Sequence, residues 1–296
     1  MGGWLDAGWP DAFWVGLSRN SEPKEETMTL TSDQIRKVVG KSASQKIIDN
    51  VIESMDTFAA EFGLDRPERA VHFLAQIAHE SAHFRTTTEY ASGAAYEGRK
   101  DLGNNYPGDG KRFRGRGLLQ LTGRANTRTF TAWMRKREPG SMDFEANPER
   151  VAEFPWAFLA SVYYWDSRNL NRYADSNNIE MITRRINGGL NGYADRLRYY
   201  DGFALAYLGF KINAVGIREF QEDMRLVADG ISGPVTRDAF HGALMAVNKP
   251  KIPAVEIAPQ PPTEEPKPTL GAPPPPKTQS IWTTLAALIG RLFIRR

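Results

Sequence analysis

A proline-rich stretch near the C-terminus limits how much of this 296-residue chain can pack into a core. Eleven of its nineteen prolines fall between Pro250 and Pro276. Proline fixes φ and lacks a backbone donor, so such a run is extended and semi-rigid and builds no packed helix or strand. The sequence therefore predicts a linker over residues 249–280, with the folded part before it and a short tail after it.

The part before the linker has the pattern of a mainly helical domain. Apolar residues recur at helical spacing through most of residues 28–210, for example at Ile35, Val38 and Val39. Residues 91–117 are instead rich in glycine, asparagine, aspartate and charge, which indicates loops and a short hairpin. Residues 1–27 lack the basic start and apolar run of a signal peptide. We expect them to be an unstructured extension, or the product of a start site assigned before Met28.

Composition excludes several classes of function. The 38 basic and 35 acidic side chains give a net charge of only +3, and no nucleic-acid-binding module stands out, so we expect no nucleic-acid partner. The chain has no cysteine, which excludes disulfides, thiolate zinc sites and a thiol nucleophile. No uncharged apolar run approaches the roughly 20 residues that span a bilayer. We expect no cofactor.

An amphipathic helix is predicted between Asp65 and Phe84. Asp65 is the expected N-cap, with Pro67 in the first turn and Glu68 at the capping-box position. Spacings of four, three and four residues place four side chains on one face, namely Phe73, Ile77, Glu80 and Phe84. A glutamate on an apolar face is partly desolvated, which favours the neutral form that a general acid needs. The alternative is a solvated or ion-paired glutamate at the rim of that face.

The same segment also matches the H-E-x-x-H pattern of zinc peptidases. His79 and His83 stand four residues apart, as two ligands on one helix face would. A zinc site needs a third protein ligand, for which Glu89 or Glu97 is available. The longer metzincin pattern fails because Thr86 stands where it requires glycine. A zinc metallopeptidase is therefore kept as an alternative, while the leading hypothesis has no metal.

Two glycine-rich polar stretches follow, Arg114–Asn126 and Ile186–Gly192, and the second leads into Ala194-Asp195-Arg196. Together with His79-Glu80-Ser81 they resemble the catalytic domain of family 19 glycoside hydrolases, above all phage endolysins and bacterial members. The resemblance covers about residues 30–210. It implies a lysozyme-like, mainly α (α+β) fold with two helical lobes, a small hairpin region and a substrate cleft between the lobes.

The resemblance also implies roles for individual residues. Glu80 matches the general acid and Glu89 the general base, with Glu97 as the alternative base. Thr122 matches the residue that orients the attacking water in an inverting mechanism. Five further residues match substrate-binding positions, namely His79, Gln120, Asn126, Asn187 and Arg196. Thr127 stands where endolysins often have an aromatic residue, which weakens one expected sugar contact.

Residues 211–248 are predicted to form a small helical segment of their own. The Phe220-Gln221 pair and the run D-G-I-S-G-P-V-T from Asp229 to Thr236 resemble a truncated peptidoglycan-binding repeat. The alternative is a helical hairpin packed against the catalytic domain. The resemblance favours peptidoglycan glycan strands over chitin as the partner. We therefore expect an endolysin-type glycosidase that cuts β-1,4 bonds; a chitinase and a non-catalytic wall-binding protein are the alternatives.

Residues 281–296 are short and apolar with a basic end. Their apolar side chains fall at helical spacing and Arg291, Arg295 and Arg296 add charge, which is typical of a helix lying on an anionic membrane surface. We expect a monomer that is made in the bacterial cytoplasm without a signal peptide and acts at the cell wall or periplasm after release.

Overall fold

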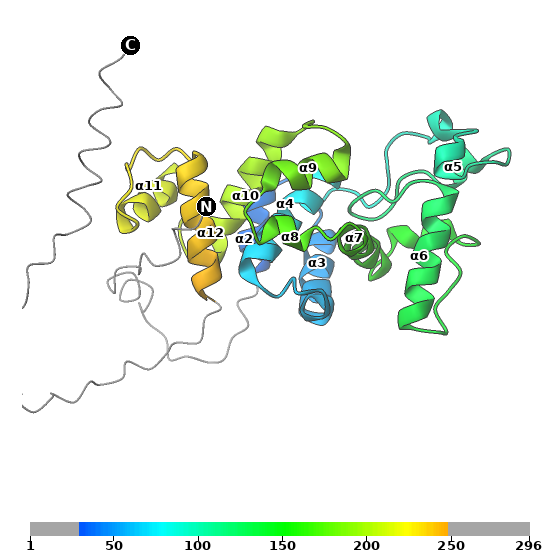
Figure 1. Cartoon of the computed structure of the whole chain (residues 1–296), viewed down its shortest axis with the longest axis horizontal. Helices are drawn as coiled ribbons and strands as arrows, with labels where there is room; N and C mark the ends of the chain where they lie inside the picture. Colours follow the sequence, from blue (N-terminus) through cyan, green and yellow to red (C-terminus); the bar gives the residue numbers. More distant parts are fainter. Residues whose placement is uncertain (1–29, 248–296) are drawn as a thin grey trace, which may run out of the picture. The chain divides into compact units, whose positions relative to one another are not determined.

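The computed structural model describes residues 30–247 of the chain (Figure 1). The expected N-terminal extension (1–27), the linker (249–280) and the basic tail (281–296) lie outside these residues. Within the described range the secondary structure is helical apart from two isolated β-bridges, which pair Thr88 with Arg116 and Arg116 with Leu121. The prediction of a mainly α fold is confirmed. None of the helices between residues 30 and 247 has the length and apolar character to cross a membrane.

Most connections between the α-helices are short, and the longest ones follow the helices that end at Glu80 and Arg137. The α-helices are α2 (Ser32–Val39), α3 (Gln45–Phe58), α4 (Pro67–Glu80), α5 (Asp109–Arg112), α6 (Arg124–Arg137), α7 (Trp156–Ser167), α8 (Asn171–Ala174), α9 (Ile179–Asn187), α10 (Tyr193–Tyr207), α11 (Ala214–Asp223) and α12 (Pro234–Val247). The 3₁₀ turns are η1 (Ala60–Phe62), η2 (Ala94–Tyr96), η3 (Lys100–Leu102) and η4 (Pro148–Ala152).

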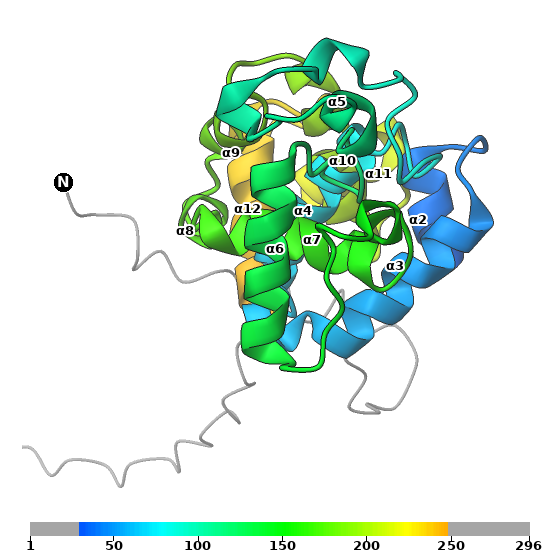
Figure 2. The ribbon, with the colours of Figure 1, turned by 90° about the vertical axis from the view of Figure 1, so that its right-hand side faces the viewer.

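Helix α4 lies at the centre of the main hydrophobic core. Its side chains are buried on all sides, including Phe73, Leu74 and Ile77, and α10 packs along it. A second, smaller core forms beneath α6 around Phe130 and Phe144. Figure 2 is viewed from the side of α5 and α6, with α6 in front of α4. Helix α7 contributes to both cores, so it joins the two helical parts.

Both ends of α4 differ from the sequence prediction. The helix begins at Pro67 with Arg66 at the N-cap, and no side chain caps it, so the assignment of Asp65 as N-cap was wrong. Proline at the first helical position has a preset φ and lacks a donor that would need capping, which places the helix start directly before it. The buried carboxylate of Glu68 pairs with Arg66 and closes no capping box.

The C-terminal end of α4 is a sharp reversal of the chain. The helix ends at Glu80, and Ala82, His83 and Phe84 all have left-handed φ values of 51°, 66° and 56°. The spacing of Phe84 had predicted that it continues the apolar face of the helix. Phe84 is fully buried, but it lies beyond the end of the helix. The buried hydroxyl of Ser81 donates to Ile77 O at 2.6 Å and accepts from Phe84 N at 3.1 Å. These two bonds hold the reversal directly after Glu80.

Residues 211–247 belong to the same core as the helices before them. Helix α12 packs on both α4 and α10, and Phe220, Phe240 and Leu244 join the main cluster of buried side chains. Arg237 of α12 donates two hydrogen bonds of 2.8 Å to Asp201 of α10. Residues 211–247 therefore pack as two helices against the preceding helices.

A cluster of buried polar groups lies where α4, α10 and α12 meet. The ring of His72 is fully buried, 4.7 Å from the Tyr200 ring and 6.2 Å from the His241 ring between centroids. Burial, together with the nearby imidazole of His241, lowers the pKa of His72 to about 3. Burial also lowers the pKa of His241. Both imidazoles are therefore neutral at neutral pH.

This cluster predicts a stability that falls with acid. Below pH 6.5 the unfolded chain binds protons that the folded chain excludes, so the free energy of unfolding falls as pH drops from about 6.5 towards 3. For His72 alone the loss between pH 7 and pH 5 is about 2 kcal/mol. Urea unfolding at both pH values measures it. His72→Phe should show a smaller loss over the same interval, and an equal loss in both proteins would contradict the assignment.

Candidate active site

Glu80 is the last residue of α4, and a buried arginine holds it. Its side chain is 21% exposed, and its Oε1 accepts a hydrogen bond from Nη2 of Arg196. Nη1 of Arg196 donates to Oε1 of Gln76, one turn before Glu80 on the same helix face. Within residues 30–247, no hydrogen bond reaches the second oxygen of Glu80, Oε2. One oxygen is thus fixed by α10, and the other is available for chemistry.

Arg196 itself does not have the place predicted for it. The resemblance put it among the substrate-binding residues, but its side chain is 0% exposed and lies behind Glu80. A buried guanidinium is costly unless it is paired, and its two partners here are both on α4. Arg196 therefore cannot contact a substrate in this structure. It positions Glu80.

The Ile186-Asn187-Gly188-Gly189 turn is anchored by Tyr164 of α7. The Tyr164 hydroxyl donates to the carbonyls of Arg185 and Ile186, both at 3.1 Å. Burial raises the pKa of Tyr164, and the negative charge of Glu80 raises it further, against the opposing charge of Arg168. Asn187 ends α9, and its Oδ1 accepts from Gly189 N at 3.2 Å. The turn is thereby anchored to α7.

His79 is tied to the first turn of α10. Its Nδ1 lies 2.8 Å from Oδ2 of Asp195, and the ring sits against Gly192, where a side chain would collide with it. Burial alone raises the pKa of Asp195, but hydrogen bonds from His79 and Arg198 hold it below its usual value. With Nδ1 engaged, only Nε2 of His79 remains for the predicted substrate contact.

Glu89, the predicted base, follows the chain reversal after α4, and its backbone pairs with the segment around Gly115. Its backbone N–H donates to Gly115 O at 2.9 Å. Its carboxylate accepts one hydrogen bond on each oxygen, from the Tyr96 hydroxyl to Oε1 at 2.9 Å and from Gly115 N to Oε2 at 3.0 Å. The isolated bridges at Arg116 continue this pairing, but residues 91–117 form the turns η2 and η3 and the short helix α5 instead of the predicted hairpin.

Gly115 is the point around which three predicted site residues gather. The position that a Cβ would occupy there lies 2.7 Å from Oε1 of Gln120, 3.2 Å from Oε2 of Glu89 and 3.2 Å from Oγ1 of Thr122. Gln120 adopts a left-handed φ of 53°, and its Nε2 donates to Gly117 O at 2.8 Å. The structure thus places the carboxylate, the amide and the hydroxyl within a few ångströms of one another.

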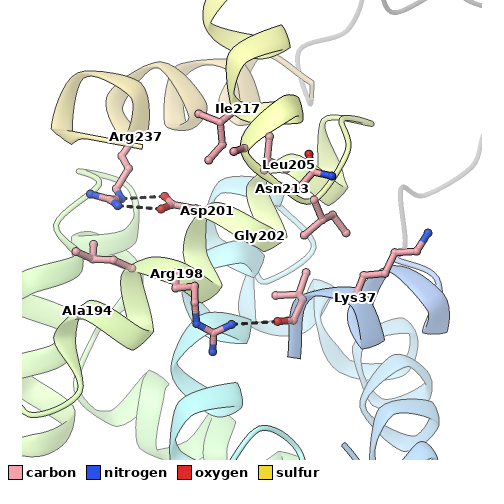
Figure 3. A pocket seen from close by; sticks show the side chains of 13 residues that line it. Lys37, Ala194, Arg198, Asp201, Gly202, Leu205, Asn213, Ile217 and Arg237 are labelled. Carbon is pink, nitrogen blue, oxygen red and sulfur yellow. Dashed lines mark hydrogen bonds and ion pairs between the residues drawn. The ribbon is translucent and has the colours of Figure 1, made fainter. Parts of the chain in front are cut away.

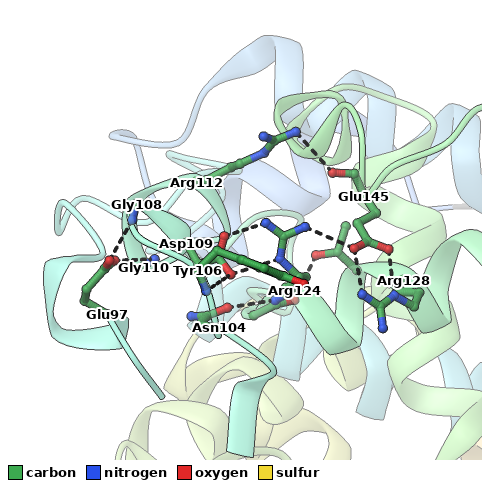
Figure 4. A network of polar contacts seen from close by, with 12 residues as sticks. Glu97, Asn104, Tyr106, Gly108, Asp109, Gly110, Arg112, Arg124, Arg128 and Glu145 are labelled. Atoms are coloured by element: carbon green, nitrogen blue, oxygen red, sulfur yellow. Dashed lines mark hydrogen bonds and ion pairs between the residues drawn. The ribbon is translucent and has the colours of Figure 1, made fainter. Parts of the chain in front are cut away.

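Two other candidates have local roles. Asn126 in the first turn of α6 donates from Nδ2 to Thr122 O at 2.7 Å, which steadies the Thr122 backbone. Glu97, the alternative base, accepts from Gly108 N at 2.6 Å and from Gly110 N at 2.8 Å (Figure 4). Both of its oxygens hold the loop that leads into α5. Of the two candidate bases, only Glu89 lies beside Gly115.

The geometry does not support the zinc pattern. Helix α4 ends before His83, so His79 and His83 do not share one helix face. Their Nδ1 atoms have different partners, Asp195 for His79 and the Tyr199 hydroxyl for His83. Over the described part of the chain, no three histidine, aspartate or glutamate side chains are arranged to hold a metal ion.

A cavity of about 470 Å³ lies elsewhere, between α2, α10, α11 and α12 (Figure 3). Val38, Leu205 and Ile217 line its apolar wall, with the Arg237–Asp201 ion pair on one side. Neither Glu80 nor Glu89 borders it, so it is not the candidate active site.

Comparison with known proteins agrees with these motifs. Over 113 residues, which are 38% of the chain, it is 36% identical to a glycosyl hydrolase family 19 domain-containing protein of Haemophilus influenzae. Over this stretch the chain is similar to a glycosyl hydrolase family 19 domain. It spans about half the length of this curated relative, 51%. No protein-family model matches the chain.

Solved structures of family 19 chitinases are similar at lower identity. Chitinase C from Streptomyces griseus is 19% identical, with a TM-score of 0.48 over 64% of this chain and 96% of the chitinase. A bacterial family 19 chitinase is 16% identical, with a TM-score of 0.46 over 60% of this chain and 95% of its own. These similarities are weak, and the family relation rests on the Haemophilus influenzae protein.

Sequence reasoning missed three residues that shape this candidate site. Gln76 acts on Glu80 through Arg196, because it accepts a hydrogen bond from the same guanidinium. Tyr96 donates directly to Glu89, and Tyr164 anchors the Asn187 turn. The available signal for Gln76 was a polar residue four positions before Glu80 on a helix of buried side chains. Tyr96 stands in a loop and carried no periodic signal.

Gly115→Ala tests whether the three polar groups around this glycine form a working site. The added methyl group meets only side-chain ends, so we expect a folded protein with a melting temperature within a few degrees of the unaltered chain. Because all three ends must shift, kcat should fall about tenfold or more. Gly140→Ala is the matched control, since nothing lies within 4 Å of its Cβ position. Normal turnover by Gly115→Ala would show that the clustering has no catalytic role.

Proposed function

We propose that this chain is a glycoside hydrolase that cuts β-1,4 bonds between N-acetylated sugars by an inverting mechanism with two carboxyl groups. The observation that carries the proposal is the convergence of Glu89, Thr122 and Gln120 around Gly115. A carboxylate beside a hydroxyl is suited to hold and deprotonate a water molecule, and an amide is suited to an N-acetyl group. The relation to family 19 supports the same chemistry.

In this mechanism Glu80 is the acid. Arg196 occupies its Oε1, so Oε2 carries the proton that passes to the oxygen of the leaving sugar. Glu89 accepts a proton from the attacking water, which Thr122 orients through its hydroxyl. Inverting enzymes need about 6.5–9.5 Å between the two carboxyl groups to admit that water.

We propose peptidoglycan as the substrate, as in an endolysin. The support is the likeness of residues 211–248 to a peptidoglycan-binding repeat, which would bring the chain to glycan strands of the cell wall. Chitin oligomers are the rival substrate, since the similar solved structures are chitinases. In the same proposal the protein is a monomer made in the bacterial cytoplasm that acts at the wall, with residues 281–296 on an anionic membrane surface.

Two parallel assays test the substrate. Clearing of outer-membrane-stripped bacteria reports wall cleavage, and release of reducing ends from chitin oligomers reports chitinase activity. We expect clearing, with new reducing ends in the digested muropeptides. Chitin turnover without any clearing would make the chain a chitinase, and binding to sacculi without reducing ends would make it a non-catalytic wall-binding protein.

Glu80→Gln and Glu89→Gln test the two carboxyl groups. Glutamine is nearly isosteric but neither donates nor accepts the proton, so each variant should lose at least about a hundredfold in kcat, the lower range for general acid–base catalysis. Glu138→Gln, on the exposed end of α6, is the matched control. Melting curves show whether each variant folds. A folded Glu80→Gln protein with near-normal turnover would show that Glu80 is not the acid. A small loss of kcat in Glu89→Gln together with a large loss in Glu97→Gln would show that Glu97 is the base.

A further inference from the structure

Tyr96 holds the candidate base through a hydrogen bond that no other side chain in the described range supplies. Its hydroxyl donates to Oε1 of Glu89 at 2.9 Å, while Gly115 N donates to Oε2. Burial raises the pKa of Tyr96, and the hydrogen bond to Glu89 raises it further. The phenol therefore keeps its proton at neutral pH and stays a donor.

The backbone of Tyr96 is fixed by a buried amide. Asn104 is fully buried, and its Nδ2 donates to Tyr96 O at 2.9 Å. Its Oδ1 accepts from Arg124 N at 3.0 Å, at the start of α6. Asn104 thus joins the turn that carries the phenol to the helix that begins two residues after Thr122. The position of the Tyr96 phenol is thereby fixed relative to the cluster around Gly115.

The side chain of Arg124 stabilises the same loop through ion pairs. Its Nε donates to Oδ2 of the buried Asp109 at 2.9 Å, and its Nη2 donates to Oδ1 of the same residue. Its Nη1 donates to Oε1 of Glu145 at 3.1 Å (Figure 4). These ion pairs hold the pKa of Asp109 below its usual value. The next residue after Tyr96, Glu97, is bonded to the backbone of Gly108 and Gly110. The loop around Tyr96 is therefore constrained on both sides.

We propose that Tyr96 is a positioning residue that keeps the Glu89 carboxylate aimed at the attacking water. The inference rests on the proposed glycosidase function. A hydrogen bond to an ionised carboxylate favours the ionised form and fixes the orientation of the group. With Oε1 held by the phenol, Oε2 stays on the side of Thr122 and Gln120, where the water would bind.

Tyr96→Phe removes the hydroxyl and keeps the ring. We expect kcat to fall about tenfold or more, with KM within twofold, because the loss of a hydrogen bond to a charged group affects the base and not substrate binding. The acidic limb of the pH profile of kcat should move to higher pH. Replacement of Tyr96 by 3-fluorotyrosine, a stronger donor of the same shape, should move that limb the other way. A purely structural role predicts neither shift.

Tyr106→Phe is the matched control. Tyr106 belongs to the same loop, its ring lies under the Arg124 guanidinium, and its side chain is mostly exposed. This variant should leave kcat and the pH limb unchanged. A carbon-13 NMR titration of the Glu89 carboxyl group adds a measurement that does not need turnover, and its midpoint should rise in Tyr96→Phe.

The outcomes separate this inference from the proposed function. An unaltered chain that cleaves neither sacculi nor chitin oligomers refutes the function, while the NMR titration still decides whether Tyr96 controls Glu89. An active chain in which Tyr96→Phe leaves the NMR midpoint and the pH limb in place overturns the positioning role, whatever happens to kcat. A folded Tyr96→Phe protein with both shifts establishes it.

Discussion

The buried pairing of Arg196 with α4 is the interaction on which the candidate site depends. Helix α10 packs along α4 and carries a guanidinium into the core, where Gln76 and Glu80 are its partners. Removing one partner of such a group leaves an unpaired buried charge, which is strongly destabilising. The register of α10 on α4 is therefore coupled to the position of Glu80, and packing of the core fixes the candidate acid.

The second carboxyl group is held by a different kind of structure. Glu89 lies outside any helix, and its orientation comes from a phenol and a backbone N–H. Loops supply such precision only when their own backbone is fixed, and here the buried Asn104 and the ion pairs of Arg124 do this. One half of the site is set by helix packing and the other by a hydrogen-bonded frame. The two carboxyl groups are therefore positioned by different means and lie in different environments.

The sequence predicted helices and motif residues better than it predicted contacts. Periodicity identified the helix through Phe73 and Ile77. The motifs named Gln120 and Thr122, which the structure brings together with Glu89. It missed the end of α4, because three consecutive non-glycine residues in left-handed conformations have no periodic signal. It also misplaced Arg196, whose partners lie 116 and 120 residues away in the chain. Burial of that kind depends on tertiary packing, and local pattern carries little information about it.

The C-terminal helices change the meaning of the wall-binding resemblance. A binding module on a flexible tether leaves its enzyme free to turn, but α12 shares a core with α4 and α10 and pairs Arg237 with Asp201. The buried imidazoles of His72 and His241 lie in this same junction. Any surface that α11 and α12 present is therefore held in fixed orientation to the helix that ends in Glu80. A glycan strand bound there would meet the carboxyl groups at a set distance and angle, so binding would select which bond along the strand reaches the site.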